Sequence, residues 1–109
     1  MLRLEGLDPS VKVVVTDSAK LDLLGIGDYI RPHNAVRAAS FVEELLDHCQ
    51  ALSELPSRHP LVPRYELHGI RRCVHADYLI FYRVGTELVE VIHILNGAQD
   101  YETLLFSNT

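Results

Sequence analysis

The hydrophobic period of this 109-residue chain changes from helical to extended at a proline-rich segment between Pro56 and Pro63. Before that segment, apolar residues recur at steps of three and four, which is typical of helices packed on a core. After it, apolar residues alternate with polar ones or form short runs, which is typical of strands. A chain that changes period in this way is expected to fold into an α+β domain, with helices on one side of a sheet.

The first part of the chain predicts a strand followed by a helix. Residues 11–16 (VKVVVT) are a β-branched run, which predicts a short strand. Thr16 opens a cluster of residues that commonly cap helices, so a helix is predicted over residues 17–30. Gly25 and Gly27 lie within this helix, and glycine costs about 1 kcal/mol relative to alanine there. We therefore expect its second half to be frayed or bent.

A second helix is predicted after Pro32, which interrupts the first one. Asn34 is a favourable N-cap residue. The apolar positions that follow it at helical steps are Ala38, Phe41, Val42, Leu45, Cys49 and Leu52. Because the connection between the two helices is so short, they are expected to pack as an antiparallel hairpin.

Four consecutive strands are predicted after the proline-rich segment, over residues 65–67, 70–75, 78–84 and 88–95. The breaks between them are only two or three residues long, and turns this short join antiparallel neighbours. The expected fold class is α+β, with an N-terminal strand, an antiparallel helical hairpin and an antiparallel sheet of three to four strands. Residues 1–109 are expected to form a single domain.

The last two predicted strands are apolar on both faces, and a single helical hairpin can cover only one of them. Two explanations are open. The proline-rich loop and residues 100–106 could cover the second face, or a partner chain could do so, since an antiparallel sheet otherwise keeps a polar face toward water.

Composition excludes several classes of protein. Apolar residues make up 48% of the chain and charged residues 23%, which is typical of a folded globular protein. No apolar run approaches the roughly 20 residues of a membrane helix, and charges near the N-terminus are unlike a signal peptide. We therefore expect a cytoplasmic protein without a membrane partner. Cys49 and Cys73 are too few for a disulfide framework and lack the spacing of a zinc site, so both are expected to be reduced packing residues.

The formal net charge is −5, but its distribution is uneven. Residues 56–83 contain five basic and two acidic side chains, whereas residues 84–109 contain four acidic ones and no basic one. An acidic protein gains little from phosphate neutralisation, the main source of non-specific nucleic-acid affinity. Direct nucleic-acid binding is therefore not expected to be the whole function.

Several strings resemble the ParE/RelE toxin superfamily in their order and spacing, over about residues 11–106. They are Gly69-Ile70-Arg71, DYLIFYRV at residues 77–84, VEVIHILNGAQD at residues 89–100, SAKLDLLGIGDYI at residues 18–30, and a helix over residues 41–55 that ends in LSELP. The predicted order of strand, helical hairpin, proline-rich loop and antiparallel meander is also similar to that superfamily.

The resemblance favours the ParE-like branch over the RelE-type mRNA interferases. RelE-type members cleave mRNA with basic residues and often a tyrosine, because cleavage needs charge stabilisation and proton transfer. At the matching positions this chain has Ile70, Leu79, Gln99 and Leu105, and only Arg72 agrees. We therefore expect no catalytic residues and no enzymatic activity.

The resemblance implies a toxin of a type II toxin–antitoxin system, of the plasmid stabilisation kind, that inhibits DNA gyrase by binding. It also implies neutralisation by a ParD-like antitoxin in a hetero-oligomer, with no cofactor. An amphipathic antitoxin segment is expected in a groove beside the helices and sheet, with some strand-like pairing. Gln99 and Asn96 replace the arginine and histidine common in ParE-like endings. A divergent mRNA interferase and a non-toxic degenerate binding module therefore remain alternatives.

Three arginines are candidates for binding the antitoxin or the target. Arg71, Arg72 and Arg83 lie on adjacent predicted strands, and guanidinium groups pair well with carboxylates. They could form one patch that receives acidic side chains, and Arg71 is the one that matches the superfamily. Alternatively, they are solvated charges of the sheet with acidic partners in Glu66, Asp77 or Glu90.

Aromatic and apolar residues complete the candidate binding site. Tyr78 and Tyr82 are expected on one face of the same strand, either as binding residues or as core aromatics with hydroxyls at the rim. Leu104, Leu105 and Phe106 belong to a short amphipathic tail, which is either a docked terminal turn or an element inserted into a target.

The six histidines raise the question of a metal or nuclease site. His68, His75 and His93 could converge across neighbouring strands. No pair of histidines has the helical or hairpin spacing of metal ligands beside a carboxylate, so no metal site is expected. A histidine base paired with Arg72 is the remaining route to an RNase.

Overall fold

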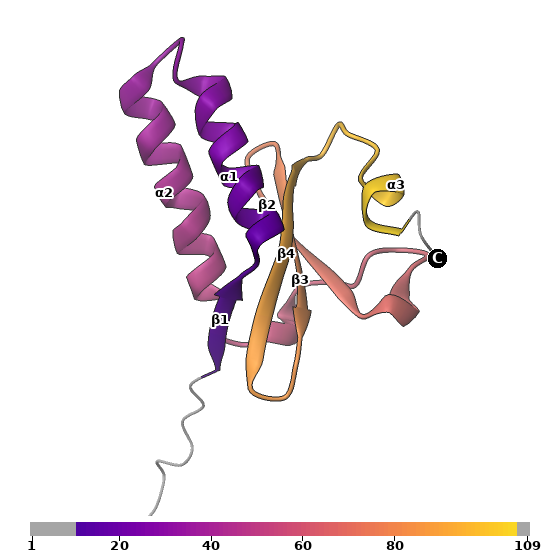
Figure 1. Ribbon diagram of the computed structural model, residues 1–109. Helices are drawn as coiled ribbons and strands as arrows, with labels where there is room; N and C mark the ends of the chain where they lie inside the picture. The colour runs from indigo at the N-terminus through magenta and orange to yellow at the C-terminus, as the bar shows by residue number, and fades with distance from the viewer. Residues whose placement is uncertain (1–10, 107–109) are drawn as a thin grey trace, which may run out of the picture.

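The structure, a computed structural model, describes residues 11–106 (Figure 1). The elements follow in the order β1 (Lys12–Val15), α1 (Asp17–Ile30), α2 (Ala35–Ala51), β2 (Ile70–His75), β3 (Tyr78–Val84), β4 (Leu88–Asn96) and α3 (Tyr101–Phe106). Two short 3₁₀ helices, Pro56–Arg58 and Glu66–His68, lie in the connection between α2 and β2. The expected α+β fold class is confirmed.

The strands form one sheet in the order β1-β4-β3-β2. Strands β2, β3 and β4 are an antiparallel meander, as expected. Strand β1 pairs with β4 in parallel, with Val13 level with Val89 and Val15 level with Val91. The helical hairpin is part of the long connection that returns the chain to the sheet, which a parallel pair requires.

The start of α1 extends the hydrogen bonding of β4 beyond the end of β1. The Thr16 amide donates to the carbonyl of Val91, and the Thr16 hydroxyl donates to the carbonyl of Ile92. Further along β4, Oδ2 of Asp22 accepts from the Ile94 amide and from Nδ1 of His93, both at 2.8 Å. These contacts fix the first helix on β4, an inner strand of the sheet.

Both helices begin at the predicted caps. The Thr16 hydroxyl accepts from the amide of Ala19, and the Asn34 side chain accepts from the amide of Arg37. The helices lie side by side as an antiparallel hairpin (Figure 1). The expectation that α1 would fray after Gly25 was wrong, because the helix continues to Ile30. Packing of Ile26 and Gly27 in the core stabilises that half.

The principal core lies between the helical hairpin and one face of the sheet. Its fully buried members include Leu45 and Cys49 of α2 and Ile80, Tyr82 and Val91 of the sheet. Both cysteines are free and buried, as expected.

A second core covers the opposite face of the sheet. Phe81 and Leu95 of the sheet pack there with Val62 of the connection and Phe106 of α3. The Phe106 ring stacks on Tyr65, with centroids 3.9 Å apart. Of the two explanations for the doubly apolar strands, the structure supports coverage by the chain itself.

The predicted strand at residues 65–67 was wrong, since Glu66–His68 is a 3₁₀ helix. Arg64 and Gly69 flank this segment with φ values of 75° and 74°, which break an extended run. The residue that bridges to the sheet edge is Leu61, opposite Arg71. The meander therefore has three strands.

Candidate functional site

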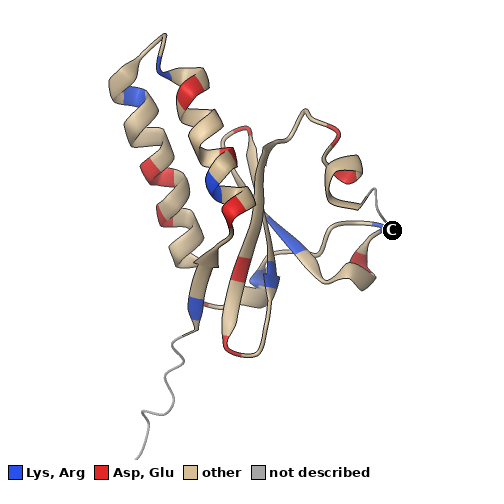
Figure 2. Cartoon of the chain, in the orientation of Figure 1, with Lys and Arg blue, Asp and Glu red and all other residues tan. Residues whose placement is uncertain are grey.

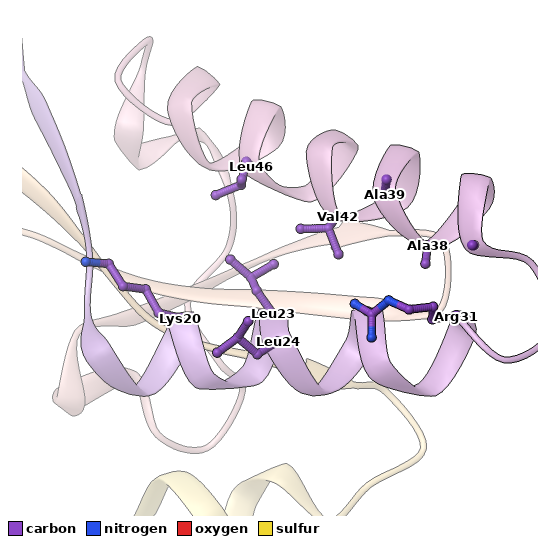
Figure 3. A pocket seen from close by; sticks show the side chains of 10 residues that line it. Lys20, Leu23, Leu24, Arg31, Ala38, Ala39, Val42 and Leu46 are labelled. Atoms are coloured by element: carbon purple, nitrogen blue, oxygen red, sulfur yellow. The ribbon is translucent and has the colours of Figure 1, made fainter.

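A groove lies between α1 and α2 (Figure 3). Its volume is about 550 Å³. The lining residues are Lys20, Leu23, Leu24, Gly27 and Arg31 of α1 and Ala35, Ala38, Ala39, Val42 and Leu46 of α2. In the close view, Val42 and Leu46 point from α2 toward α1, and Lys20 and Arg31 lie at opposite ends.

Small residues create this groove because they allow space between the two helices that larger side chains would fill. Gly27 is buried, and a Cβ atom there would lie 3.5 Å from Val42. Leu24 is 64% exposed and Leu46 is 37% exposed, so apolar surface faces solvent along the groove. An apolar groove with a cation at each end suits an amphipathic helix that carries carboxylates.

The three candidate arginines do not form one patch. Arg71 and Arg72 are successive residues of β2 and lie on opposite faces of the sheet. Arg71 donates to the backbone carbonyls of Ser57 and His59, at 3.1 and 2.7 Å. Nη1 of Arg83 lies 3.7 Å from Oε1 of Glu90, one of the three acidic partners considered from the sequence. These arginines therefore have separate partners within the chain.

Arg72 helps to hold α3 on the second core. Its Nη1 donates to the hydroxyl of Tyr101 at 2.6 Å. Beside it, Arg64 forms an ion pair with Glu102 in which one nitrogen reaches both carboxylate oxygens at 2.8 Å. At the start of α3, Asp100 accepts from the amide and hydroxyl of Thr103, and these hydrogen bonds lower the pKa of Asp100.

The candidate residues of the tail belong to this docked helix. Phe106 is buried, Leu105 packs against the second core, and Leu104 is 54% exposed. The structure thus places the tail as a docked terminal turn in this form of the protein. Leu104 is the tail residue that remains open to a partner.

Tyr78 and Tyr82 both point toward the principal core, as the alternation of β3 predicted. Tyr82 is 0% exposed, and its hydroxyl donates to the carbonyl of Pro56 at 2.6 Å. Burial raises the pKa of Tyr82. Tyr78 is partly buried against the ring of Phe41. Tyr82 therefore acts as a core residue in this conformation and offers no surface to a partner.

His68, His75 and His93, which could have converged, are in separate surroundings. Nε2 of His75 lies 3.0 Å from Glu44 of α2, whereas His93 bonds Asp22 of α1. The ring of His68 packs on Phe106. Within residues 11–106, no group of three or more histidine, cysteine or acidic side chains is placed to hold a metal ion.

Glu44 is the centre of a polar cluster that ties α2 to the end of the β2–β3 hairpin. Arg37 donates to Glu44 at 2.6 Å, and His75 contacts the other carboxylate oxygen. These two contacts, that of Arg37 first, lower the pKa of Glu44. The ring of His48 lies 4.2 Å from that of His75, centroid to centroid. Sequence patterns did not reveal this cluster, because His75 lies 31 residues from Glu44 in the chain.

The positions that carry RelE-type catalytic residues are largely packed in the second core. Ile70 is buried there, and Leu79 and Leu105 pack against it. Gln99 is exposed, and its side chain accepts from the amide of Asn96 at 3.0 Å. Apolar side chains in a packed core supply neither a proton nor a charge to a substrate.

No helix within residues 11–106 combines the length and apolar character needed to cross a membrane.

Solved structures of toxin–antitoxin complexes have the same fold. A chain of the chromosomal ParDE system from P. aeruginosa superposes with a TM-score of 0.69 and 17% identity, over 82% of this chain and 98% of the other. A chain of the RelBE2 complex from Mycobacterium tuberculosis gives a TM-score of 0.59 and 20% identity, over 80% and 98%. This chain therefore shares its fold with chains of these two toxin–antitoxin systems.

Sequence comparison identifies the family to which the chain belongs. Residues 13–101 match the family model of the ParE toxin of the type II toxin–antitoxin system parDE. The chain is also 36% identical over 86 residues to toxin ParE1 of Caulobacter vibrioides, an alignment that covers 75% of this chain and 84% of that toxin. This chain belongs to the ParE family of type II toxins.

Proposed function

We propose that this toxin is neutralised by a ParD-like antitoxin, one segment of which binds as an amphipathic helix in the groove between α1 and α2. The observation that carries the proposal is the form of this groove, with apolar walls and a cationic residue at each end. Leu24 and Leu46 present apolar surface to a helix, and Lys20 and Arg31 are suited to its carboxylates. A ParDE system among the structures of the same fold supports this type of partner.

We further propose that the toxin acts by binding DNA gyrase and makes or breaks no covalent bond itself. Support comes from the second core, where Ile70, Leu79 and Leu105 replace residues that an mRNA interferase uses. The arginine that agrees with that catalytic set, Arg72, is bonded to Tyr101. Without exposed acids and bases at these positions, inhibition through contact is the simpler mechanism.

The groove is tested by titrating the toxin with a ParD-like antitoxin by calorimetry. Leu46→Asp places a carboxylate in the apolar wall of the groove, and we expect the dissociation constant to rise at least about tenfold. Leu67→Asp introduces the same charge at a fully exposed leucine outside the groove and should leave the affinity unchanged. Equal affinities for the two variants would exclude the groove as the binding site.

The target is tested with purified components. The toxin alone should inhibit supercoiling by DNA gyrase and increase the amount of cleaved DNA, and it should leave mRNA on ribosomes intact. Cleavage of ribosome-bound mRNA that is lost in Arg72→Ala would refute the proposal and support an interferase. If neither activity is found, the protein is a binding module without this toxicity.

A further inference from the structure

The outward face of α1 carries charged and apolar residues in a symmetric pattern. Both acidic and basic residues occur along α1 (Figure 2). At 100° per residue, six exposed residues fall in one stripe of the helix: Asp17, Lys20, Leu21, Leu24, Asp28 and Arg31. We call these six residues the α1 stripe.

The charges of the α1 stripe are arranged about Leu24. Lys20 lies four residues before Leu24 and Asp28 four residues after it. Asp17 lies seven residues before Leu24 and Arg31 seven residues after it. Each basic residue is therefore matched by an acidic residue at the same distance on the other side of Leu24. A two-fold symmetric contact needs this kind of self-complementary surface.

We propose that a second copy of this chain binds here, with the two α1 helices antiparallel and a two-fold axis passing beside Leu24. In that arrangement Lys20 lies level with Asp28 of the second copy, and Asp17 lies level with Arg31 of the second copy. The symmetry repeats both pairs, so four oppositely charged pairs surround a centre in which the two Leu24 side chains meet.

Contacts within one chain explain only part of the α1 stripe. Asp17 is favoured at the first turn of a helix, and Asp28 forms an ion pair with Arg31. Within residues 11–106, no contact covers the two leucines between these charges, and Leu21 is 68% and Leu24 64% exposed. Burial against a second α1 would remove this apolar surface from water.

The contact is expected to be weak and reversible. A helix of 14 residues is roughly 21 Å long, so one helix pair buries less than the roughly 1,200 Å² of a stable interface. Association should weaken as salt is added, because exposed charge pairs are screened. Lys20, Leu24 and Arg31 also line the groove between the helices, so a segment bound in the groove would exclude the second copy.

Exchanging the charges of Lys20 and Asp28 tests whether these residues lie level in the dimer. The dissociation constant of the dimer is measured by sedimentation equilibrium of the purified chain, from micromolar to millimolar concentration. Lys20→Glu places two carboxylates level with each other, and Asp28→Lys places two cations level, so each should raise the dissociation constant of the dimer at least about tenfold. The double variant K20E/D28K restores opposite charges and should return to within about threefold of the original value. Lys12→Glu, which changes an exposed lysine of β1, controls for net charge.

Cross-linking tests the two-fold axis directly. Leu24→Cys brings the two new thiols together, so a short bismaleimide should link two chains at low protein concentration, while Leu67→Cys should give no such product. Cys49 and Cys73 are buried and do not compete for the reagent. A chain that stays monomeric at all concentrations, a double variant as weak as the single ones, or equal cross-linking of both cysteine variants would overturn the proposal. None of these measurements involves an antitoxin, so they are independent of the proposed function.

Discussion

Asp22 is expected to be the polar residue on which the placement of α1 depends most. Its carboxylate accepts two hydrogen bonds from β4, both 2.8 Å long, at a point more than 70 residues away in the sequence. Asp22→Ala leaves the amide of Ile94 without its acceptor, which costs about 1–3 kcal/mol, and removes a charge-assisted bond to His93. We expect a total loss of about 3 kcal/mol in the free energy of unfolding.

Urea unfolding followed by circular dichroism measures this loss. For a slope of about 2 kcal/mol/M, the midpoint should fall by about 1.5 M. Asp22→Asn keeps one carbonyl oxygen for the amide of Ile94, so its midpoint should lie between those of the wild type and Asp22→Ala. Asp47→Ala removes an exposed carboxylate of α2 and should change stability by less than about 0.5 kcal/mol. If Asp22→Ala were as stable as Asp47→Ala, the assigned role of the carboxylate would be refuted.

Three further outcomes follow from the contacts described. Tyr82→Phe removes the buried hydrogen bond to the carbonyl of Pro56 and should lower the free energy of unfolding by about 0.5–1.5 kcal/mol in the same urea assay. The pKa of Glu44 is lowered in the folded state, so its carboxylate stabilises the fold above its unfolded pKa, and this stabilisation is lost as the pH falls through the folded pKa. Glu44→Gln lacks this carboxylate. Its melting temperature should therefore fall less than that of the wild type on acidification from pH 6 to about pH 3. Burial raises the pKa of Cys49 to about 12 and also raises that of Cys73, so neither thiol should react with a disulfide reagent at pH 8 until the chain unfolds.

Each of these outcomes has a result that contradicts it. An unchanged urea midpoint in Tyr82→Phe would mean that water replaces the hydroxyl at Pro56. Parallel melting curves for Glu44→Gln and the wild type across the acidic range would show that the ion pair with Arg37 does not persist in solution. Rapid labelling of a cysteine in the native protein would show that the principal core opens locally.

The candidate site was only partly predictable. The sequence indicated a groove beside the helices and sheet, and the structure has one between the two helices. The residues that line it were missed, although small residues such as Gly27 and Ala38 and the exposed Leu24 were a signal for it. The basic residues of the meander were predicted to bind instead, because the sequence does not show which charged side chains form hydrogen bonds or ion pairs within the chain.

The sequence by itself determined the local structure. The helices α1 and α2 begin at Thr16 and Asn34, and the meander follows the proline-rich segment, because caps, helical periods and tight turns depend on residues only a few positions apart. Family membership was also recognisable, because it rests on short sequence motifs and on their order along the chain.

Only the tertiary structure decided what depends on distant segments. It set β1 parallel to β4, covered the second face of the sheet with α3, and separated Arg71 from Arg72 on opposite faces. It also placed Tyr82 in the core and turned the expected strand at residues 65–67 into a 3₁₀ helix. Each of these outcomes depends on which of several distant segments packs on a given apolar surface, and local sequence patterns do not determine that.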